Sequence, residues 1–543
     1  MSRAHDLAGA PVARARLGAA GAAAVATACF GLRAISLARP CWSDDEAIYA
    51  VVARELLAGR VLYRDVVDHK PPLIYALYAV TQALGGPVGG MALLHGVTIL
   101  VVLGTALLLG RIAGRFAAQE SNGRAPFFAA LLYAVFTTTL LPFDSLAANC
   151  ELYMMLPLAA SVLLFLRGAA HPRFTWFAGA GALLGIAVLF KYQAGVQVLL
   201  YGGYLVGLRR SRRGRPLFGI AGVAAGLALV LASGAIVLQR AGSLGAAWFW
   251  FRFNFSYMKE GLHPFEAAVR ACVRVSFVGV SALFLWALGF GAALRIAISR
   301  ELRGRRGDGL HGFERSAGSD GFDGFDGFAS GWLAASAVAT VAGGRFFGHY
   351  FHQLTAPLAI LAAPEAARLW KSRRGLVVAG MAVPAVCFAL VALFHDRVMA
   401  AAGEPDPDYP RLARVIDAYS RPGDGVVVWG NLPVLAFEAR RPLGSRFVFS
   451  NYLTGLSPAT QSQWDPKADA SANIVPESWD MFTRDLALRR PRLFVDTSPG
   501  NLAGYGKFPP SRFPRLRAIL ARDYHPIGEM AGIRVFERLD KSD

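Results

Sequence analysis

Two adjacent aspartates stand at the start of a predicted helix early in the chain. Asp44 and Asp45 follow Ser43 in the stretch CWSDDEAIYAVVARELLAG. Ser43 and Glu46 have the spacing of a capping box, and Gly59 stands where such a helix would end. Capping accounts for Glu46, but two consecutive aspartates exceed what a cap requires. A positioned carboxylate can take a proton from an attacking hydroxyl, so the pair predicts catalysis by at least one aspartate.

A lysine between polar residues and paired prolines follows in the same segment, Asp68-His69-Lys70-Pro71-Pro72. The prolines end any helix before them, so Lys70 begins the next apolar run. A lysine at a membrane surface often only extends its ammonium into water. Beside an acidic cluster, however, Lys70 can hold a lipid phosphate while a carboxylate acts as the base.

More polar and ionisable residues stand at the ends of later apolar runs. They are Asp144, Asn149, Glu151, Lys191, Tyr192, Arg345, His349, Tyr350, His352 and Gln353. Ionisable residues near membrane spans are candidates for function, although each alone can equally be an interfacial anchor. The predicted topology puts all of them on the same side as Asp45 and Lys70, which favours one common site.

The elements that carry these residues are strongly apolar. Of 543 residues, 55% are hydrophobic and 17% are charged, against about 25% charged in soluble domains. Apolar runs of about 20 residues recur, as in membrane-spanning helices. This composition excludes a soluble enzyme and a disordered chain. Five cysteines in the whole chain exclude a disulfide scaffold.

Basic residues outnumber acidic ones by 56 to 37, a formal net charge of +19. They gather in short clusters between apolar runs, at 209–215, 300–306 and 371–374. This is the positive-inside pattern of a membrane protein with several spans. It gives no basic stripe with interleaved exposed aromatic residues, so we expect no nucleic-acid partner.

The charge clusters predict about eleven transmembrane helices with the N-terminus in the cytoplasm. The first span is uncleaved and covers about 17–37, and the outer loop 38–70 follows. Residues 71–86 are too short to cross and are predicted to be re-entrant or interfacial. The remaining spans are expected near 91–110, 125–142, 151–167, 174–190, 192–208, 217–238, 270–294, 329–344, 350–367 and 375–394.

After about residue 398 the chain becomes ordinary soluble sequence. We expect a transmembrane domain over 1–398 and a small extracytoplasmic α/β domain over 399–543. Strands are predicted at Val426–Trp429, Arg446–Phe449, Leu493–Val495 and Ile533–Phe536, and helices at Arg411–Ser420 and Trp479–Arg489.

The first loop also carries a family resemblance. The stretch DDEAIYAVVARELLAGRVLYRDVVDHKPPLIY closely resembles the first periplasmic loop of bacterial glycosyltransferase family 39-type proteins. These are relatives of the protein O-mannosyltransferases and of the lipid A aminoarabinose transferase, and they have the GT-C fold. FDSLAANCELYMMLPLA and RFFGHYFHQLTAPLA resemble the second acidic loop and a later outward-facing span start of that family. The resemblance covers residues 1–395, and VVVWGNLPVLAFEARRPLGSRFVFSNYL resembles the family's distal domain.

The resemblance implies a GT-C glycosyltransferase of the bacterial inner membrane, a hexosyl- or pentosyltransferase similar to families 39 and 83. Such an enzyme transfers a sugar from a polyprenyl phosphate to a hydroxyl of an envelope acceptor (lipid, glycan or protein) outside the membrane. Asp45 matches the general base, with Asp44 beside it, and Lys70 matches the residue that holds the donor phosphate. A single base and a phosphate clamp predict inversion at the sugar carbon.

The remaining candidate residues take supporting roles. Arg345 and Lys191 are expected to join Lys70 at the phosphate, and substrate contacts are expected from Glu46, Tyr49, Asp68, His69, Glu151 and His349. Some relatives have an acidic metal ligand just before the lysine. Here that position is His69, so we predict no metal residue, and a divalent metal as cofactor stays open.

Two alternatives accompany this interpretation. A transporter or flippase of lipid-linked sugars would also have many spans, but it tends to show repeats and charges at the bilayer midplane. Cys41 and Cys150 fall on the outer side and can form a disulfide there. Two separate free thiols are the favoured interpretation of this pair.

Overall fold

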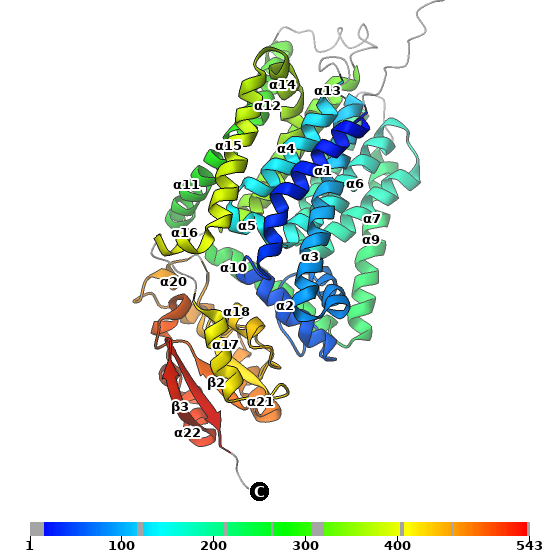
Figure 1. Cartoon of the computed structure of the whole chain (residues 1–543). Helices are drawn as coiled ribbons and strands as arrows, with labels where there is room; N and C mark the ends of the chain where they lie inside the picture. The colour runs from blue at the N-terminus through cyan, green and yellow to red at the C-terminus, as the bar shows by residue number, and fades with distance from the viewer. Residues whose placement is uncertain are drawn as a thin grey trace, which may run out of the picture.

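The computed structural model of the chain describes residues 16–116, 123–210, 216–261, 264–305, 320–401, 407–458 and 460–539. A bundle of long helices forms one part of the molecule, and a smaller part with a β-sheet lies against one end of the bundle (Figure 1). We call residues 407–539 the C-terminal region. A helical protein with a small C-terminal sheet agrees with the predicted fold class.

The bundle contains sixteen described α-helices. They are α1 (Ala19–Arg33), α2 (Asp44–Leu57), α3 (Leu73–Phe116), α4 (Ala125–Thr139), α5 (Pro142–Leu146), α6 (Cys150–Ala170), α7 (Phe174–Phe190), α8 (Gln197–Arg210), α9 (Pro216–Arg240), α10 (Leu244–Gly261), α11 (Pro264–Ser281), α12 (Leu283–Arg305), α13 (Asp320–Val341), α14 (His352–Ser372), α15 (Arg374–Leu393) and α16 (His395–Ala401).

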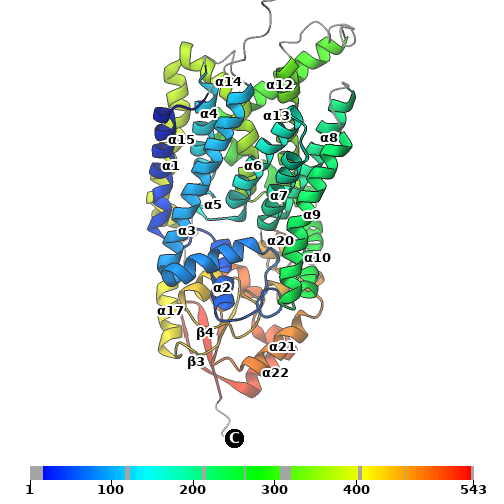
Figure 2. The ribbon, with the colours of Figure 1, turned by 90° about the vertical axis from the view of Figure 1, so that its right-hand side faces the viewer.

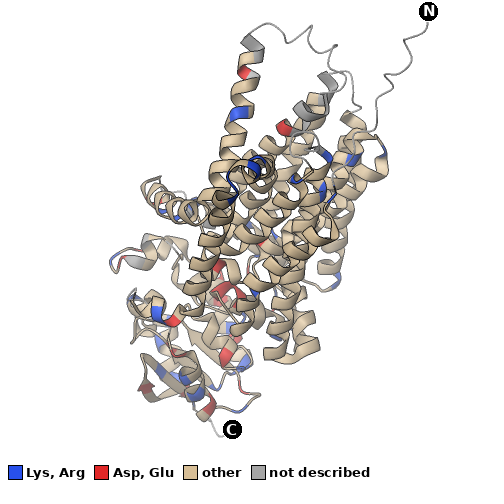
Figure 3. Cartoon of the chain, turned by 45° about the horizontal axis from the view of Figure 1, so that its top comes forward, with Lys and Arg blue, Asp and Glu red and all other residues tan. Residues whose placement is uncertain are grey.

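Several of these helices have the length and composition of membrane spans. Five qualify among the described residues, or six if the bent pair α11 and α12 counts as one span, and α4 and α7 are shorter apolar helices. The total of eleven spans therefore stays a prediction. Figure 3 shows several Lys and Arg at the helix ends far from the C-terminal region, whereas Asp and Glu gather near it.

One predicted span is not a continuous helix, and one helix was not predicted. The segment 270–294 is divided, because α11 and α12 meet near Ala282 and are bent by 101°. Helix α10 was missed because polar residues interrupt its aromatic ones from Arg252 onward in WFWFRFNFSYMK, so no long apolar run marks it. This helix carries Trp250, Phe253 and Asn254 toward the site described below.

The segment predicted to be re-entrant is the first part of α3. At Gly86 the backbone leaves helical geometry, with φ 71°, and Pro87 follows. The chain bends so sharply that a Cβ on Gly90 would lie 2.6 Å from the Cα of Gln82. The helical part before the break, about 13 residues, is about 20 Å long and too short to cross a bilayer. It lies across the end of the bundle (Figure 2).

The C-terminal region is built on a four-stranded mixed sheet with the order β1-β2-β4-β3. Its strands are β1 (Val426–Trp429), β2 (Leu493–Asp496), β3 (Tyr524–Met530) and β4 (Ile533–Arg538), and its helices are α17 (Tyr409–Ala418), α18 (Pro433–Glu438), α19 (Asn451–Thr454), α20 (Gln461–Trp464), α21 (Ser478–Arg489) and α22 (Pro514–Asp523). Strands β1 and β2 are parallel, and the other neighbours are antiparallel.

Three of the four predicted strands and both predicted helices are confirmed. The strand predicted at Arg446–Phe449 is wrong, because this segment makes a single bridge from Phe447 to Val67 of the first loop instead of joining the sheet. Strand β3 was missed because Pro526 and Gly528 interrupt its pattern. The structure places them at a bulge in a strand at the sheet edge, where both residues are tolerated.

The first loop (residues 38–70) and the C-terminal region share one hydrophobic core. Helix α2 contributes residues 47–53, and β1 and β2 contribute most of their residues, to the same buried cluster. Polar contacts reinforce it: Arg54 donates to the carbonyl oxygen of Ala436, and the backbone N–H of Leu443 donates to Glu55. The C-terminal region is therefore packed against the segment that carries the candidate catalytic residues.

Cys41 and Cys150 are free thiols in the structure. Cys150 is buried, and its Sγ lies 3.5 Å from the hydroxyl oxygen of Tyr49. The structure therefore agrees with the favoured interpretation, in which Cys41 and Cys150 are two separate thiols.

Candidate functional site

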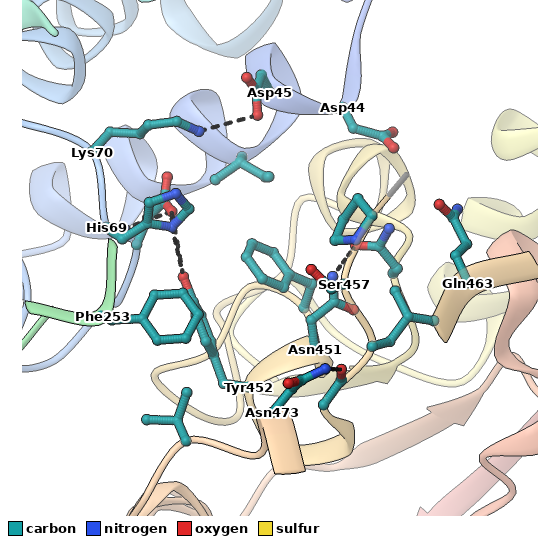
Figure 4. Close-up of a pocket in the computed structure, with 18 of the residues that line it drawn as sticks. Asp44, Asp45, His69, Lys70, Phe253, Asn451, Tyr452, Ser457, Gln463 and Asn473 are labelled. Carbon is teal, nitrogen blue, oxygen red and sulfur yellow. Dashed lines mark hydrogen bonds and ion pairs between the residues drawn. The ribbon is translucent and has the colours of Figure 1, made fainter. Parts of the chain in front are cut away.

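A cavity of about 520 Å³ lies between the end of the bundle and the C-terminal region. Its described lining includes Asp44, Asp45, Asp68, His69, Lys70, Asp144, Phe253, His349, Asn431, Asn451, Tyr452 and Ser457. The volume is in the range of small-molecule sites. Figure 4 shows the residues of α2 and the first loop on one side and those of the C-terminal region facing them.

Local sequence explains why Asp45 faces this cavity. Ser43 caps α2 by accepting a hydrogen bond from the backbone N–H of Glu46, as the capping-box pattern predicts. The helix then ends before Gly59, whose φ of 86° is the left-handed conformation that glycine favours. The chain reverses there and brings Lys70 back to the first turn of the helix.

Asp45 and Lys70 form an ion pair in the cavity, with 3.4 Å between Nζ of Lys70 and Oδ1 of Asp45 (Figure 4). Burial alone would raise the pKa of the Asp45 carboxyl, but Lys70 and His349 more than offset this, so the pKa lies below its ordinary value. Asp45 is therefore ionised at neutral pH and able to accept a proton. Asp44 lies on the same turn, is exposed and points away from Lys70.

His349 joins the acidic residues of two loops. Its Nδ1 lies 3.2 Å from Oδ1 of Asp144, and its Nε2 lies 3.9 Å from Oδ2 of Asp45. Burial lowers the pKa of this imidazole, but the surrounding carboxylates raise it further, so the net pKa is above its ordinary value. Arg33 at the end of α1 fixes the second loop by donating to the carbonyl oxygens of Ser145 and Leu146.

Asp68 and His69 connect the first loop to the C-terminal region. Asp68 is almost completely buried and accepts hydrogen bonds from the hydroxyl of Tyr75 and the backbone N–H of His69. Nδ1 of His69 lies 3.0 Å from Oδ1 of Asp68 and 3.2 Å from the hydroxyl of Tyr452. The lone pairs of Asp68 are thus used within the protein, which makes it a positioning residue for His69 and Lys70.

The backbone around Lys70 is held from several directions. The hydroxyl of Tyr63 donates to the carbonyl oxygen of Lys70 at 2.7 Å, and Asn254 of α10 donates to that of His69 at 3.2 Å. The indole N–H of Trp250 in turn donates to the carbonyl oxygen of Tyr63. The ammonium is therefore attached to a fixed backbone, and only its side-chain torsions can vary.

The eleven predicted site residues fall into two groups. Six line the cavity: Asp44, Asp45, Asp68, His69, Lys70 and His349. Five are not among its described lining residues: Glu46, Tyr49, Glu151, Lys191 and Arg345. All five are buried, and their polar groups contact other parts of the protein.

Three of these buried residues, Glu151, Lys191 and Arg345, make contacts next to the cavity lining. Lys191 pairs with Glu151 at 2.8 Å and lies over the ring of Tyr350, 4.9 Å from its centroid. Arg345 donates to the carbonyl oxygen of Pro458 at 3.0 Å and so fixes a loop of the C-terminal region. The roles predicted for Lys191 and Arg345 at a phosphate need a rearrangement that frees these cations.

Glu46 joins the first and second loops. Its carboxylate accepts from the backbone N–H groups of Trp42 and Ala148, at 2.5 and 2.6 Å. Both N–H groups are enclosed in the protein, so losing either acceptor atom would leave a buried donor without a partner.

We expect Glu46→Gln to lower the free energy of unfolding by about 1–3 kcal/mol, because the amide offers one acceptor oxygen where two are used. The measurement is thermal unfolding of the purified protein in detergent. Glu529→Gln, at an exposed ion pair with Arg534, is the matched control and should change stability by less than about 0.5 kcal/mol. Equal stability of the two variants would contradict the structural role of Glu46.

The donor set at the cavity does not fit a metal ion. Among the described residues no group of three or more His, Cys, Asp or Glu side chains is arranged to hold one. His69, at the position where a metal ligand was considered, has its Nδ1 beside Asp68 and Tyr452.

Sequence reasoning missed the half of the cavity that comes from the end of the chain. Tyr452, Asn451 and Ser457 follow the segment Arg446–Phe449, where a strand is predicted, and Phe253 lies on the unpredicted helix α10. The only local signal was a change from apolar to polar residues after Phe449, in SNYLTGLS. Such a change is common at the end of any buried segment.

Comparisons with known proteins support the predicted resemblance. Residues 69–236 match the family model described as dolichyl-phosphate-mannose-protein mannosyltransferase. No curated protein matches the sequence significantly. The oligosaccharyltransferase of Archaeoglobus fulgidus, solved in complex with Zn and sulfate, is 14% identical with a TM-score of 0.50, over 95% of this chain and 73% of that one.

ArnT from Cupriavidus metallidurans in the apo state is 15% identical over 91% of this chain and 93% of that one, with a TM-score of 0.39, too low to support an argument. The archaeal match shows the fold alone, because its sequence identity is low. Residues 69–236 are therefore similar in sequence to dolichyl-phosphate-mannose-protein mannosyltransferases, and the chain has the GT-C fold that the first loop predicts.

Proposed function

We propose that this protein transfers a sugar from a polyprenyl-phosphate-sugar donor to a hydroxyl of an envelope acceptor, with inversion at C1 of the sugar. The observation that carries the proposal is the Asp45–Lys70 pair in a cavity at the end of an apolar bundle. A carboxylate and an ammonium side by side supply the base and the phosphate ligand that this reaction needs. The matching family model, whose described members use dolichyl-phosphate-mannose, supports a lipid-linked donor.

The ion pair also explains how donor binding can prepare the base. In the free protein the ammonium of Lys70 holds down the pKa of Asp45. A donor phosphate on Lys70 would share that positive charge, so the pKa of Asp45 would rise and the carboxylate would become a stronger base. The acceptor hydroxyl then loses its proton to Asp45 as its oxygen attacks C1, and the bond from C1 to the phosphate oxygen breaks.

The phosphate leaves as an anion and needs no general acid. Lys70 neutralises the charge that develops on it, and its fixed backbone keeps the ammonium in place. His349 holds Asp144 near Asp45 and balances the negative charge of the two carboxylates. Attack from the side opposite to the leaving phosphate requires the base and the ammonium on opposite sides of C1. The 3.4 Å Asp45–Lys70 pair of the free protein therefore has to separate when the donor binds, with the ammonium moving onto the phosphate.

A transporter or flippase of the same lipid is the other candidate, and turnover separates the two. The purified protein is incubated in detergent with polyprenyl phosphates that carry labelled mannose, glucose or aminoarabinose, with an envelope extract as acceptor. Release of free polyprenyl phosphate, with label in the extract, is expected of a transferase. Binding or translocation of intact donor in vesicles without its cleavage would identify a flippase.

We further propose that the cavity and the C-terminal region face the outside of a bacterial inner membrane. The topology predicts that a cysteine at Gly123 is protected from membrane-impermeant thiol reagents in spheroplasts, because it lies on the cytoplasmic side. A cysteine at Leu488, which is 75% exposed on α21, should be labelled. Both are placed in a variant without the five native cysteines. Labelling at position 123 would show that residues 71–86 cross the membrane.

A further inference from the structure

The two sides of the cavity differ in charge. The acidic, basic and histidine residues among the described lining come from the bundle side, at Asp44, Asp45, Asp68, His69, Lys70, Asp144 and His349. The described lining residues of the C-terminal region lie between 431 and 476, and none of them is charged. This is unexpected in a chain with a net charge of +19. We call these C-terminal lining residues the neutral wall.

The neutral wall offers hydrogen-bonding groups that the protein leaves available. Oδ1 of Asn431 accepts from the amide of Asn451 at 3.1 Å, so the amide group of Asn431 keeps its own hydrogens as donors. Ser457 is 3% exposed, and its Oγ has no hydrogen-bond partner among the described residues. A buried hydroxyl without a partner costs stability unless a ligand or water completes it.

Aromatic rings lie beside these polar groups. Phe449 and Tyr452 are part of the neutral wall, and Phe253 of α10 lines the cavity next to them (Figure 4). Polar amides and hydroxyls next to aromatic rings suit a ligand with both hydroxyl groups and apolar C–H surface, as a sugar ring has.

Charge argues against an anionic acceptor. Lys70 is the only lysine or arginine among the described lining residues, and it already pairs with Asp45. With the donor phosphate on Lys70, a second phosphate would face Asp44 and Asp144, and the imidazole of His349 in the described lining already lies between Asp144 and Asp45. Like charges repel strongly in a partly buried site, which would reject a phosphorylated acceptor.

The cavity also lacks the features that commonly bind peptides. Extended peptides commonly bind to an exposed strand edge, and acidic or phosphorylated ones bind to arginine clusters. None of the described lining residues belongs to β1–β4, and none is an arginine.

We propose that the neutral wall binds the acceptor, and that the acceptor is an uncharged glycan that presents a free hydroxyl to Asp45. The inference rests on the proposed function and adds the substrate class. In the step, the acceptor O–H gives its proton to Asp45 and its oxygen forms the new bond to C1. The bond from C1 to the phosphate oxygen breaks, and its electron pair leaves with the polyprenyl phosphate.

The test uses the full chain in detergent and compares three acceptors. Maltotetraose is the neutral glycan, maltotetraose 1-phosphate is its charged counterpart, and a blocked Ala-Ser-Ala peptide represents a protein acceptor. Equilibrium dialysis measures binding of each compound without turnover, and release of polyprenyl phosphate measures transfer. We expect maltotetraose to bind at least tenfold more tightly than its phosphate or the peptide.

Two substitutions test whether the neutral wall causes the preference for maltotetraose. Asn431→Leu and Ser457→Ala should each raise the Kd for maltotetraose about three- to tenfold, as expected for one lost hydrogen bond. Ser457→Ala removes only the hydroxyl oxygen and its hydrogen, so it still tests the neutral wall if Asn431→Leu does not fold. Gln239→Leu removes an exposed amide outside the described lining and should change the Kd by less than twofold.

Three outcomes would overturn the inference: tighter binding of the phosphate, tighter binding of the peptide, or maltotetraose binding that neither wall variant changes. Donor cleavage that continues in any of these cases leaves the proposed function intact. Failure to cleave or bind any donor, with maltotetraose binding that depends on Asn431, would overturn the proposed function and leave a glycan-binding site.

Discussion

Asp45→Asn is expected to lower sugar transfer by about 10²–10⁴-fold, the range that a general base contributes. The amide keeps the volume of the side chain and an oxygen near Lys70, but it cannot take the proton of the acceptor. Donor binding and thermal stability should change little, because the ion pair is partly exposed to the cavity. The measurement is kcat for release of polyprenyl phosphate at saturating donor.

Asp44→Asn is the matched control, one residue away on the same helical turn. Its carboxylate is exposed and does not face Lys70, so we expect transfer to fall by less than tenfold. Full turnover in Asp45→Asn together with a large loss in Asp44→Asn would exchange the two roles. Full turnover in both variants would exclude the pair as the source of the base.

Lys70→Ala is expected to weaken donor binding by about 10- to 100-fold, because a hydrogen bond between charged groups contributes about 1.5–3 kcal/mol. A second effect should appear in the pH profile. In the wild type Lys70 lowers the pKa of Asp45, so its removal raises that pKa. The acid limb of the rate profile should therefore move to higher pH, since Asp45 now becomes protonated at higher pH.

Lys70→Arg distinguishes charge from shape. The guanidinium keeps the positive charge, but its planar fork has a different reach, so donor affinity should recover only in part. The pH profile should return close to that of the wild type, because the charge beside Asp45 is restored. Unchanged donor affinity in Lys70→Ala would contradict the role of Lys70 at the phosphate.

Local signals in the sequence predicted the elements that carry this pair. Ser43, Gly59 and the two prolines after Lys70 act over a few residues, and the structure contains the helix and the turn that they indicate. Asp45 and Lys70 are only 25 residues apart in sequence, so one helix and one turn are enough to bring them together. Short-range patterns can therefore predict this half of the site.

The opposite half could not be predicted in this way. His69 meets Tyr452 across 383 residues, and nothing local to either residue indicates the contact. Lys191 and Arg345 show a related limit: the topology gives the side of the membrane, but not whether a cation faces a cavity or is buried against Glu151 or Pro458. These outcomes depend on how whole elements pack.

The core shared by the first loop and the C-terminal region has a consequence for biosynthesis. Glu55 meets the backbone of Leu443 across 388 residues, so this contact waits for almost the entire chain to be translated. Helix α3, which packs against α2 through Tyr75 and Tyr78, follows within a few seconds, but at about 5–20 residues per second the C-terminal partner of α2 arrives only about 20–80 s after the helix is made. During this interval the end of α2 that contacts the C-terminal region through Arg54 and Glu55 is open to proteases and to misassembly. Premature termination before β1 would leave a helical bundle in which α2, the helix that carries the proposed base, lacks its C-terminal partner.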